Sequence, residues 1–502
     1  MGKKSSLNRR DFLKKTAVGT AGLTAGLSLL KPAKAQAATI GAWTGTNFEI
    51  NPNISNLRVV CMYDTAMITN ATPNYDSCDD VVNACDQTAI DTNMDNMAMW
   101  LAQKTTATEA WSTIFQKPAS KTWPNVIVAI KVNTCNITDE PRVPVIMKIC
   151  NVLKTLEVTP GNITIYDGAC QNISGSGYSN YFNTKGGTYN GYTVFPCNVS
   201  ADLLTTSVTV PNVGSKDCPS TLANGTTDIL INISVNKGHT LSADGNTGGC
   251  TLAHKNHFGT FTPTSPMHTM PISTGDCAIY CNMTDAIIGG TPVRQQLCIV
   301  DSLWADNNDN PDGQPNGALY RLVMGTFAGA VDLLTCLQIK YLIAYKQLGG
   351  VWKNNMDITV TDTNGVYTVT GGQVAHFMTL YGYESNDPDL EWVAITPASV
   401  YGTGVLSGAA SGGQPHTLEV RLAGGAAMAR FELPQSTTGA MEIRMFDLSG
   451  RSVRKMFVEL QEGRTSVSWD GKNDNGSAVA PGTYEVRVLA QHYMHSGRIT
   501  VE

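Results

Sequence analysis

The chain has 502 residues, a formal net charge of −6 and charged residues at only 15% of its length. This is too long for one ordinary domain, and 42% apolar residues suffice for large cores, which excludes a disordered chain. The acidic balance argues against nucleic acid as a partner, because phosphate binding needs a clustered positive field. Thirteen cysteines are unusual for a reducing cytosol unless they bind a metal or carry redox chemistry.

The first 37 residues predict an export signal. The pair Arg9-Arg10 is followed by Phe12-Leu13, by a weakly apolar run over Ala17–Leu30 and by a small-residue exit. This combination resembles a twin-arginine signal peptide, which implies removal of residues 1–37 and a periplasmic or extracellular protein. A membrane anchor is the alternative, but the apolar run is about 14 residues and a spanning helix needs roughly 20. We therefore expect no transmembrane segment in the mature chain.

Export by this route has consequences for charge and cofactor. Loss of the signal removes eight basic residues and one acidic residue and leaves a net charge of −13. The twin-arginine resemblance also implies a protein that folds before it is exported. That order favours a cofactor inserted in the cytoplasm.

Composition divides the mature chain. All thirteen cysteines precede residue 337, and a run of Gly, Ser and Ala over residues 402–413 has the composition of a flexible linker. We predict an α/β domain at 40–401, the linker, and an all-β domain at 414–502.

The C-terminal domain predicts a small β-sandwich, because short alternating strands follow one another with turns about every ten residues. The Asp-Leu-Ser-Gly run at 447–450 and the Trp-Asp-Gly run at 469–471 resemble the immunoglobulin-like module related to the flagellar hook-capping protein. Trp469 and Tyr484 are the expected core anchors, and Gly471 is an expected turn residue with positive φ, as is Gly476. The resemblance implies attachment or a secretion-system contact.

The large domain predicts an α/β fold with a mainly parallel sheet and flanking helices. Val126–Val132 is a continuous apolar run of strand length, Val143–Leu156 has helical spacing, and Asn162–Tyr166 reads as the next strand. This succession is a βαβ unit and implies parallel pairing. Asp228–Val235 and Gln296–Val300 supply further strands.

Ligands in such sheets bind beyond the carboxyl ends of the strands. Polar residues recur there, namely Lys131, Asn133, Asp167, Lys237, His239 and Asp301. Four of the eight histidines then fall within thirty residues, together with Lys255: His239, His254, His257 and His268. Imidazoles serve as acid, base or metal ligand near neutral pH, and a lysine among positive neighbours becomes a usable nucleophile. A solvated polar loop is the alternative.

These residues carry a family resemblance. The runs Val128–Asn133, Lys237–His239, Thr251–Gly259, Ile299–Asp301 and Gly325–Asp332 resemble, in order, motifs of the domain of unknown function 362 family. Its members are often exported and some carry iron–sulfur modules, so the resemblance implies a site and leaves the reaction open.

A more distant similarity, to lactate racemase-like enzymes, implies a nickel-pincer nucleotide. In that interpretation Lys255 is the tether, His268 a nickel ligand and His239 an acid/base group. The Gly245–Gly249 insertion stretches the spacing between His239 and Lys255, and Leu252–His254 replaces the glycine-rich approach.

An iron–sulfur cluster is the less favoured cofactor, because Cys277 and Cys281 have three residues between them and no ferredoxin-like C-x-x-C run exists. We expect structural disulfides formed after export, with at least one thiol left over from an odd number of cysteines.

Two functions are open. The first is a cofactor- or metal-dependent enzyme acting on a small anionic or hydroxylated substrate. The second is a non-catalytic cell-surface binding or structural protein with a C-terminal attachment module. The enzyme hypothesis assigns catalysis to His239, His257 and Lys255 and metal binding to His268. It assigns cofactor or anion contacts to Lys255, Lys131, Asn133, Lys237, Asn256 and Asp301.

Overall fold

The computed structural model describes most of the chain beyond residue 47. The described residues are 48–134, 139–168, 181–182, 195–239, 249–262, 277–306, 313–315, 317–347, 358–363, 366–387, 389–397, 399, 401, 418–423, 426–431, 439–447, 452–460, 469, 471–490 and 493–501. Among them, no helix has both the length and the apolar character needed to cross a membrane. The predicted signal, the linker and His268 lie outside the described residues.

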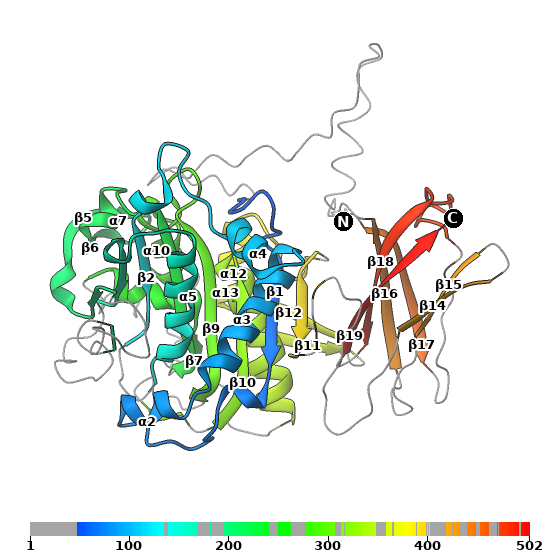
Figure 1. Cartoon of the computed structure of the whole chain (residues 1–502), viewed down its shortest axis with the longest axis horizontal. Coiled ribbons are helices and arrows are strands. Elements are labelled where there is room, and N and C mark those ends of the chain that lie inside the picture. The colour runs from blue at the N-terminus through cyan, green and yellow to red at the C-terminus, as the bar shows by residue number, and fades with distance from the viewer. Residues whose placement is uncertain are drawn as a thin grey trace, which may run out of the picture. The chain divides into compact units, whose positions relative to one another are not determined.

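A large, mostly parallel sheet organises the first domain (Figure 1). Its strand order is β13 (Glu391–Ile395), β1 (Arg58–Tyr63), β10 (Gly317–Gly325), β9 (Gln295–Asp306), β7 (Ile229–His239), β2 (Val128–Lys131), β3 (Ile163–Tyr166) and β4 (Cys197–Asn198), with β8 (Gly249–Thr251) paired to β7. Only β10 and β8 run antiparallel to their neighbours. The α/β prediction is therefore confirmed.

The predicted βαβ unit is present. Val128 pairs with Ile163 across the parallel strands β2 and β3, and α5 (Val143–Thr155) connects them. The helix buries Val145, Ile149 and Leu153 against the sheet. This apolar stripe at helical spacing explains why the segment folds as a helix here.

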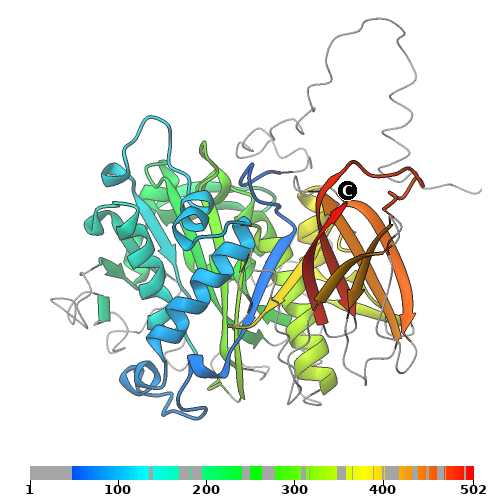
Figure 2. The same cartoon turned by 45° about the vertical axis from the view of Figure 1, so that its right-hand side comes forward.

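Side chains of the central strands alternate between the two faces. Ile231 and Ile233 of β7 belong to the core beneath α5, together with α3 (Gln87–Ala102), which lies on the same face (Figure 2). Asn232 points to the opposite face, where its amide donates to the carbonyl oxygen of Ala253 in α8 (Ala253–Asn256). One face of the central strands is therefore apolar, and the other face carries polar side chains.

Shorter elements complete the domain. The remaining helices are α2 (Cys78–Asn83), α4 (Ala107–Ile114), α7 (Ser220–Ala223), α10 (Cys277–Asn282), α11 (Asp285–Ile288), α12 (Ala328–Leu334), a π-helix (Thr335–Gln347) and α13 (Gln373–Leu380). The remaining strands form the pairs β5 (Leu204–Val210) with β6 (Gly214–Pro219), and β11 (Thr359–Thr363) with β12 (Val366–Gly371).

The C-terminal part is antiparallel β, as predicted. Its four-stranded sheet has the order β17 (Ser452–Leu460), β16 (Gly439–Asp447), β18 (Gly482–Ala490) and β19 (Tyr493–Val501), and β14 (Leu418–Ala423) pairs with β15 (Ala426–Phe431). Trp469 and Tyr484 are buried with ring centroids 5.5 Å apart, and Gly471 and Gly476 have φ values of 68° and 78°. Both expectations about anchors and turns are confirmed.

The cysteines differ from expectation. Free thiols at five described positions give no support to the predicted disulfides: Cys61, Cys85, Cys150, Cys218 and Cys298. Burial raises the pKa of Cys61 and Cys218 to about 12. Four of them, all but the partly buried Cys85, lie buried in strands or helices and pack as small apolar residues.

Candidate functional site

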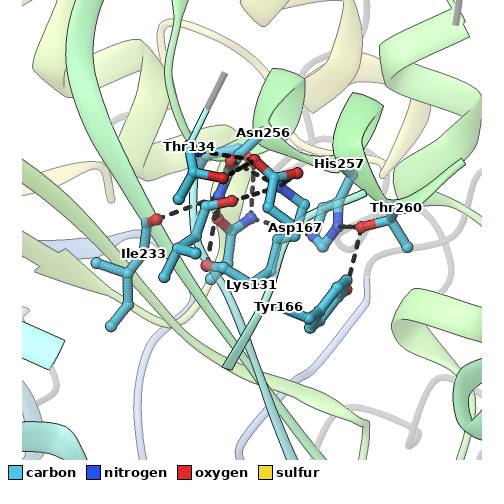
Figure 3. Close-up of polar contacts among 11 residues, drawn as sticks. Lys131, Thr134, Tyr166, Asp167, Ile233, Asn256, His257 and Thr260 are labelled. Carbon is cyan, nitrogen blue, oxygen red and sulfur yellow. Dashed lines mark hydrogen bonds and ion pairs between the residues drawn. The ribbon is translucent and has the colours of Figure 1, made fainter. Parts of the chain in front are cut away.

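A first group of polar side chains forms a buried network at the carboxyl edge of the sheet (Figure 3). Lys131 ends β2 and Asp167 follows β3, and Lys131 Nζ lies 3.0 Å from Asp167 Oδ1 with each side chain 1% exposed. The same amine donates to Asn256 Oδ1 at 3.1 Å and to the carbonyl oxygen of Val132. Asp167 Oδ2 accepts from the Thr134 amide at 2.7 Å. All three lysine donors have acceptors, as a stable buried charge requires.

Gly259 lies directly against this ion pair. Its carbonyl oxygen accepts from the amide of Gly168 at 2.8 Å, which brings the two loops into contact. A Cβ at Gly259 would lie 1.9 Å from Asp167 Oδ1 and 2.7 Å from Lys131 Nζ. Only glycine allows the backbone to approach this closely.

The network extends through α8. Asn256 donates to Asn232 Oδ1 at 2.8 Å. His257 Nε2 lies 2.6 Å from Gln295 Oε1, and its Nδ1 lies 3.0 Å from Thr260 Oγ1. Burial lowers the pKa of His257 to about 3, so the ring is neutral at physiological pH. A neutral imidazole with both nitrogens engaged supports the packing around α8 better than the proton transfer expected from the sequence.

Asp332 fixes the other end of α8. Its carboxylate accepts from the amides of Ala253 and His254 at 2.8 Å each and also contacts the His254 ring at Nδ1. The helix that carries Lys255 is thus held at its start by Asp332 and at its end by Asn256. Lys255 itself is 5% exposed, and its Nζ lies 5.7 Å from the ring centroid of Phe258.

A second polar group surrounds the N-terminus of α5. Asp301 Oδ2 accepts from the backbone amide of Arg142 at 2.7 Å. The Arg142 guanidinium lies over the Trp304 ring, with Cζ 5.2 Å from the ring centroid, and its Nη1 donates to the carbonyl oxygen of Glu140. Its Nη2 is 3.8 Å from Asp139 Oδ1, which is an ion pair without a hydrogen bond.

This second group contains buried polar atoms that lack hydrogen bonds within the described part of the chain. They are both carboxylate oxygens of Asp139, Glu140 Oε2, Arg142 Nε and Nη2, and Lys237 Nζ. Asp139 is fully buried, and Lys237 is 1% exposed. An unpaired buried polar group costs free energy, and a cluster of them calls for a reason.

The carboxyl groups of this cluster have raised pKa values. Burial raises the pKa of Asp139 to about 6, although the positive charges of Lys237 and Arg142 act in the opposite direction. Burial likewise raises the pKa of Glu140 and of Asp301. Perturbed carboxyl groups gathered in one place are typical of functional sites, and a pKa near 6 suits an acid/base group.

The structure separates the residues predicted from sequence. It places Lys131, Asn256 and His257 in the first polar group. It places Asp301 and Lys237 in the second polar group. Asn133, 8% exposed, follows β2. His239 ends β7, but its side chain lies outside the described residues, as does the whole of His268.

Metal binding by these residues stays a prediction. Within the described ranges, no three His, Cys, Asp or Glu side chains are arranged to hold a metal ion. The nickel interpretation depends on His239 and His268, and neither side chain is described. A mass addition on Lys255 in intact-protein mass spectrometry would be its signature.

Sequence reasoning missed Asp139 and Arg142. Their signal is the run Asp-Glu-Pro-Arg at 139–142, in which opposite charges stand between the end of a strand and the first turn of a helix. Asp332 ends the run Gly325–Asp332, which carries part of the family resemblance. Its role could not be assigned, because its partner His254 is 78 positions away.

Comparison with known protein families gives two matches. The model described as Domain of unknown function (DUF362) matches residues 128–336, which include both polar groups. The model described as FlgD Ig-like domain matches residues 413–492. No curated protein matches the chain.

Proposed function

Residues 128–336 match the DUF362 family and residues 413–492 match a FlgD Ig-like domain, and from the geometry of the second polar group we propose that the first domain is an enzyme for a small anionic or hydroxylated substrate. Its site is the second polar group, at the carboxyl edge of the sheet. Asp139 is the acid/base residue and Lys237 binds the substrate anion.

One observation supports the proposal above all. Lys237 Nζ and the Asp139 carboxyl group are buried, influence each other electrostatically and lack hydrogen bonds in the described part of the chain. An anionic substrate would give Lys237 its acceptor, and a substrate hydroxyl or an acidic C–H group would give Asp139 a proton to remove. Binding would therefore satisfy groups that folding leaves unsatisfied.

The chemistry needs only a proton transfer by this chain's own residues. The ionised Asp139 removes a proton from the substrate and becomes neutral, and the nearby positive charge of Lys237 stabilises the negative charge that develops on the substrate. The proton on Asp139 then exchanges with solvent, so that in D₂O the carboxyl group returns a deuteron to the same substrate position. The substrate is otherwise unchanged.

The test is proton exchange. We expect the full chain, incubated in D₂O with a panel of 2-hydroxy and 2-oxo acids, to replace a substrate C–H proton by deuterium, as followed by ¹H NMR. Because the reaction needs ionised Asp139, its rate should rise through about pH 6. Asp139→Asn should abolish exchange, whereas the matched change Asp95→Asn on α3 should not. Equal exchange by wild type and Asp139→Asn would contradict the proposal.

We also propose that the protein is exported by the twin-arginine route and that the C-terminal domain contacts the cell surface or a secretion system. The pair Arg9-Arg10 and the match to the FlgD Ig-like domain support these two parts. Replacement of both arginines by lysine should leave an uncleaved precursor in the cytoplasm, detected by fractionation. The control Lys14→Arg should be exported normally, and normal export of the double variant would refute the route.

A further inference from the structure

We propose that the ligand of this site carries a carboxylate or phosphate group, and that Arg142 binds that group with its Nε and Nη2 atoms as a pair. The inference rests on the proposed function, because it names the chemical class of the same site's substrate.

Arg142 is held so that only one side of its guanidinium is left for a ligand. Its backbone amide donates to Asp301, its Nη1 donates to the carbonyl oxygen of Glu140, and its planar face lies on Trp304. The side chain is 1% exposed and has little freedom to turn. The Nε–H and Nη2–H groups form a fork, and its orientation is therefore set before any ligand binds.

The two remaining donors form the geometry that matches an oxyanion. Nε and Nη2 point to the same side of a guanidinium and present two parallel N–H bonds, which fit two oxygens of a carboxylate or phosphate. Both atoms are buried and lack hydrogen bonds in the described part of the chain. A small pocket borders the residue, lined by Cys78, Val81, Val82, Glu140, Arg142 and Val143.

Asp139 does not occupy this fork. Its Oδ1 is 3.8 Å from Arg142 Nη2, beyond hydrogen-bond distance, and both of its oxygens lack hydrogen bonds in the described residues. By contrast, Arg58 Nε donates to Glu391 Oε2 at 2.8 Å, which is the distance of a structural pair. A purely structural role for Arg142 would favour the closer arrangement, since a neighbouring carboxyl group is present.

The experiment measures binding of simple anions to the full chain. Isothermal titration at pH 7 would use inorganic phosphate, acetate and malonate as probes, so that the stronger of the phosphate and carboxylate arms identifies the group. Arg142→Lys keeps the charge and removes the paired donors, and we expect affinity to fall at least about tenfold. Arg58→Lys is the matched control and should keep wild-type affinity, because β1 places it at the other edge of the sheet.

The outcomes separate this inference from the function proposed above. Equal affinity in wild type and Arg142→Lys overturns the fork, and if Lys237→Met still weakens binding, the anion site stands without it. Failure of all three anions to bind the wild type overturns the assignment of an anion to the Arg142 fork. The proposed proton transfer is tested separately, by the deuterium-exchange assay. Should Arg142→Lys not fold, the wild type labelled with ¹⁵N-arginine carries the test. At saturating anion, an Nε–H signal that does not shift overturns the assignment.

Discussion

Two groups of buried polar residues lie at the carboxyl edge of the same sheet, and they treat charge in opposite ways. Around Lys131, every donor of the amine has an acceptor, and a carboxylate lies 3.0 Å away. In the second group, Arg142 Nε and Nη2, Lys237 Nζ and both oxygens of Asp139 are equally buried but lack hydrogen bonds in the described residues.

The difference shows how a buried polar cluster that stabilises the fold can be distinguished from one that binds a ligand. A satisfied network rigidifies the fold and gains nothing from a ligand, whereas an unsatisfied one is less stable until a ligand completes it. Lys131 and Lys237 are both lysines and are equally buried. The two residues therefore differ in their hydrogen-bond acceptors and not in their exposure.

The strongest way to break the satisfied network is Gly259→Ala. The added methyl group would occupy space that Asp167 and Lys131 already fill, so we expect the loss of about 4 kcal/mol or more and little folded protein. Thermal unfolding followed by circular dichroism would measure it. Gly161→Ala, where no atom lies within 4 Å of the added Cβ, is the control. Normal stability of the Gly259 variant would contradict the close contact.

A pair of identical substitutions tests the contrast itself. Lys131→Met removes one partner of a buried ion pair and leaves Asp167 uncompensated, so we expect a loss of about 3 kcal/mol in the free energy of unfolding. Lys237→Met removes an amine that has no hydrogen bond in the described chain, and should leave stability unchanged or raise it. Chemical denaturation gives both values. Equal destabilisation by the two changes would abolish the distinction between the groups.

The last expected effect depends on pH. In the folded protein the pKa of Asp139 is about 6, against an ordinary value of 3.8. The contribution of the protonated carboxyl group to the stability of the fold is therefore present below about pH 4 and is lost as pH rises through 6. Asp139→Asn cannot ionise, and should be more stable than wild type by roughly 3 kcal/mol at pH 8 and by little at pH 4. Denaturation at the two pH values measures the difference. A difference that does not change with pH would mean that Asp139 is not buried as described.

Much of the fold could be predicted from sequence, because its signals are local. The apolar run at 126–132 and the helical spacing from Val143 identify β2 and α5. The turns with positive φ in the C-terminal domain are marked by glycines between the predicted strands. Pairing of β2 with β3 then follows from the connection between them.

The site was only half predictable, because partners are not local. Polar residues after strands located the correct edge and included both Lys131 and Lys237. The sequence could not tell that the acceptors of Lys131 come from Asp167 and Asn256, up to 125 positions away, or that none of the described residues supplies an acceptor for Lys237. Strand alternation decides which face each side chain takes, and that requires the register of β7 against its neighbours.

The enclosed thiols have a consequence for the timing of maturation. Cys150 and Cys298 are fully buried, and burial raises the pKa of both. A sulfur atom enclosed in a core does not reach an oxidase, and as a protonated thiol it reacts slowly. A chain with thirteen cysteines that reached an oxidising compartment unfolded would risk many incorrect pairings. A core that is complete beforehand would keep these two sulfurs away from an oxidase.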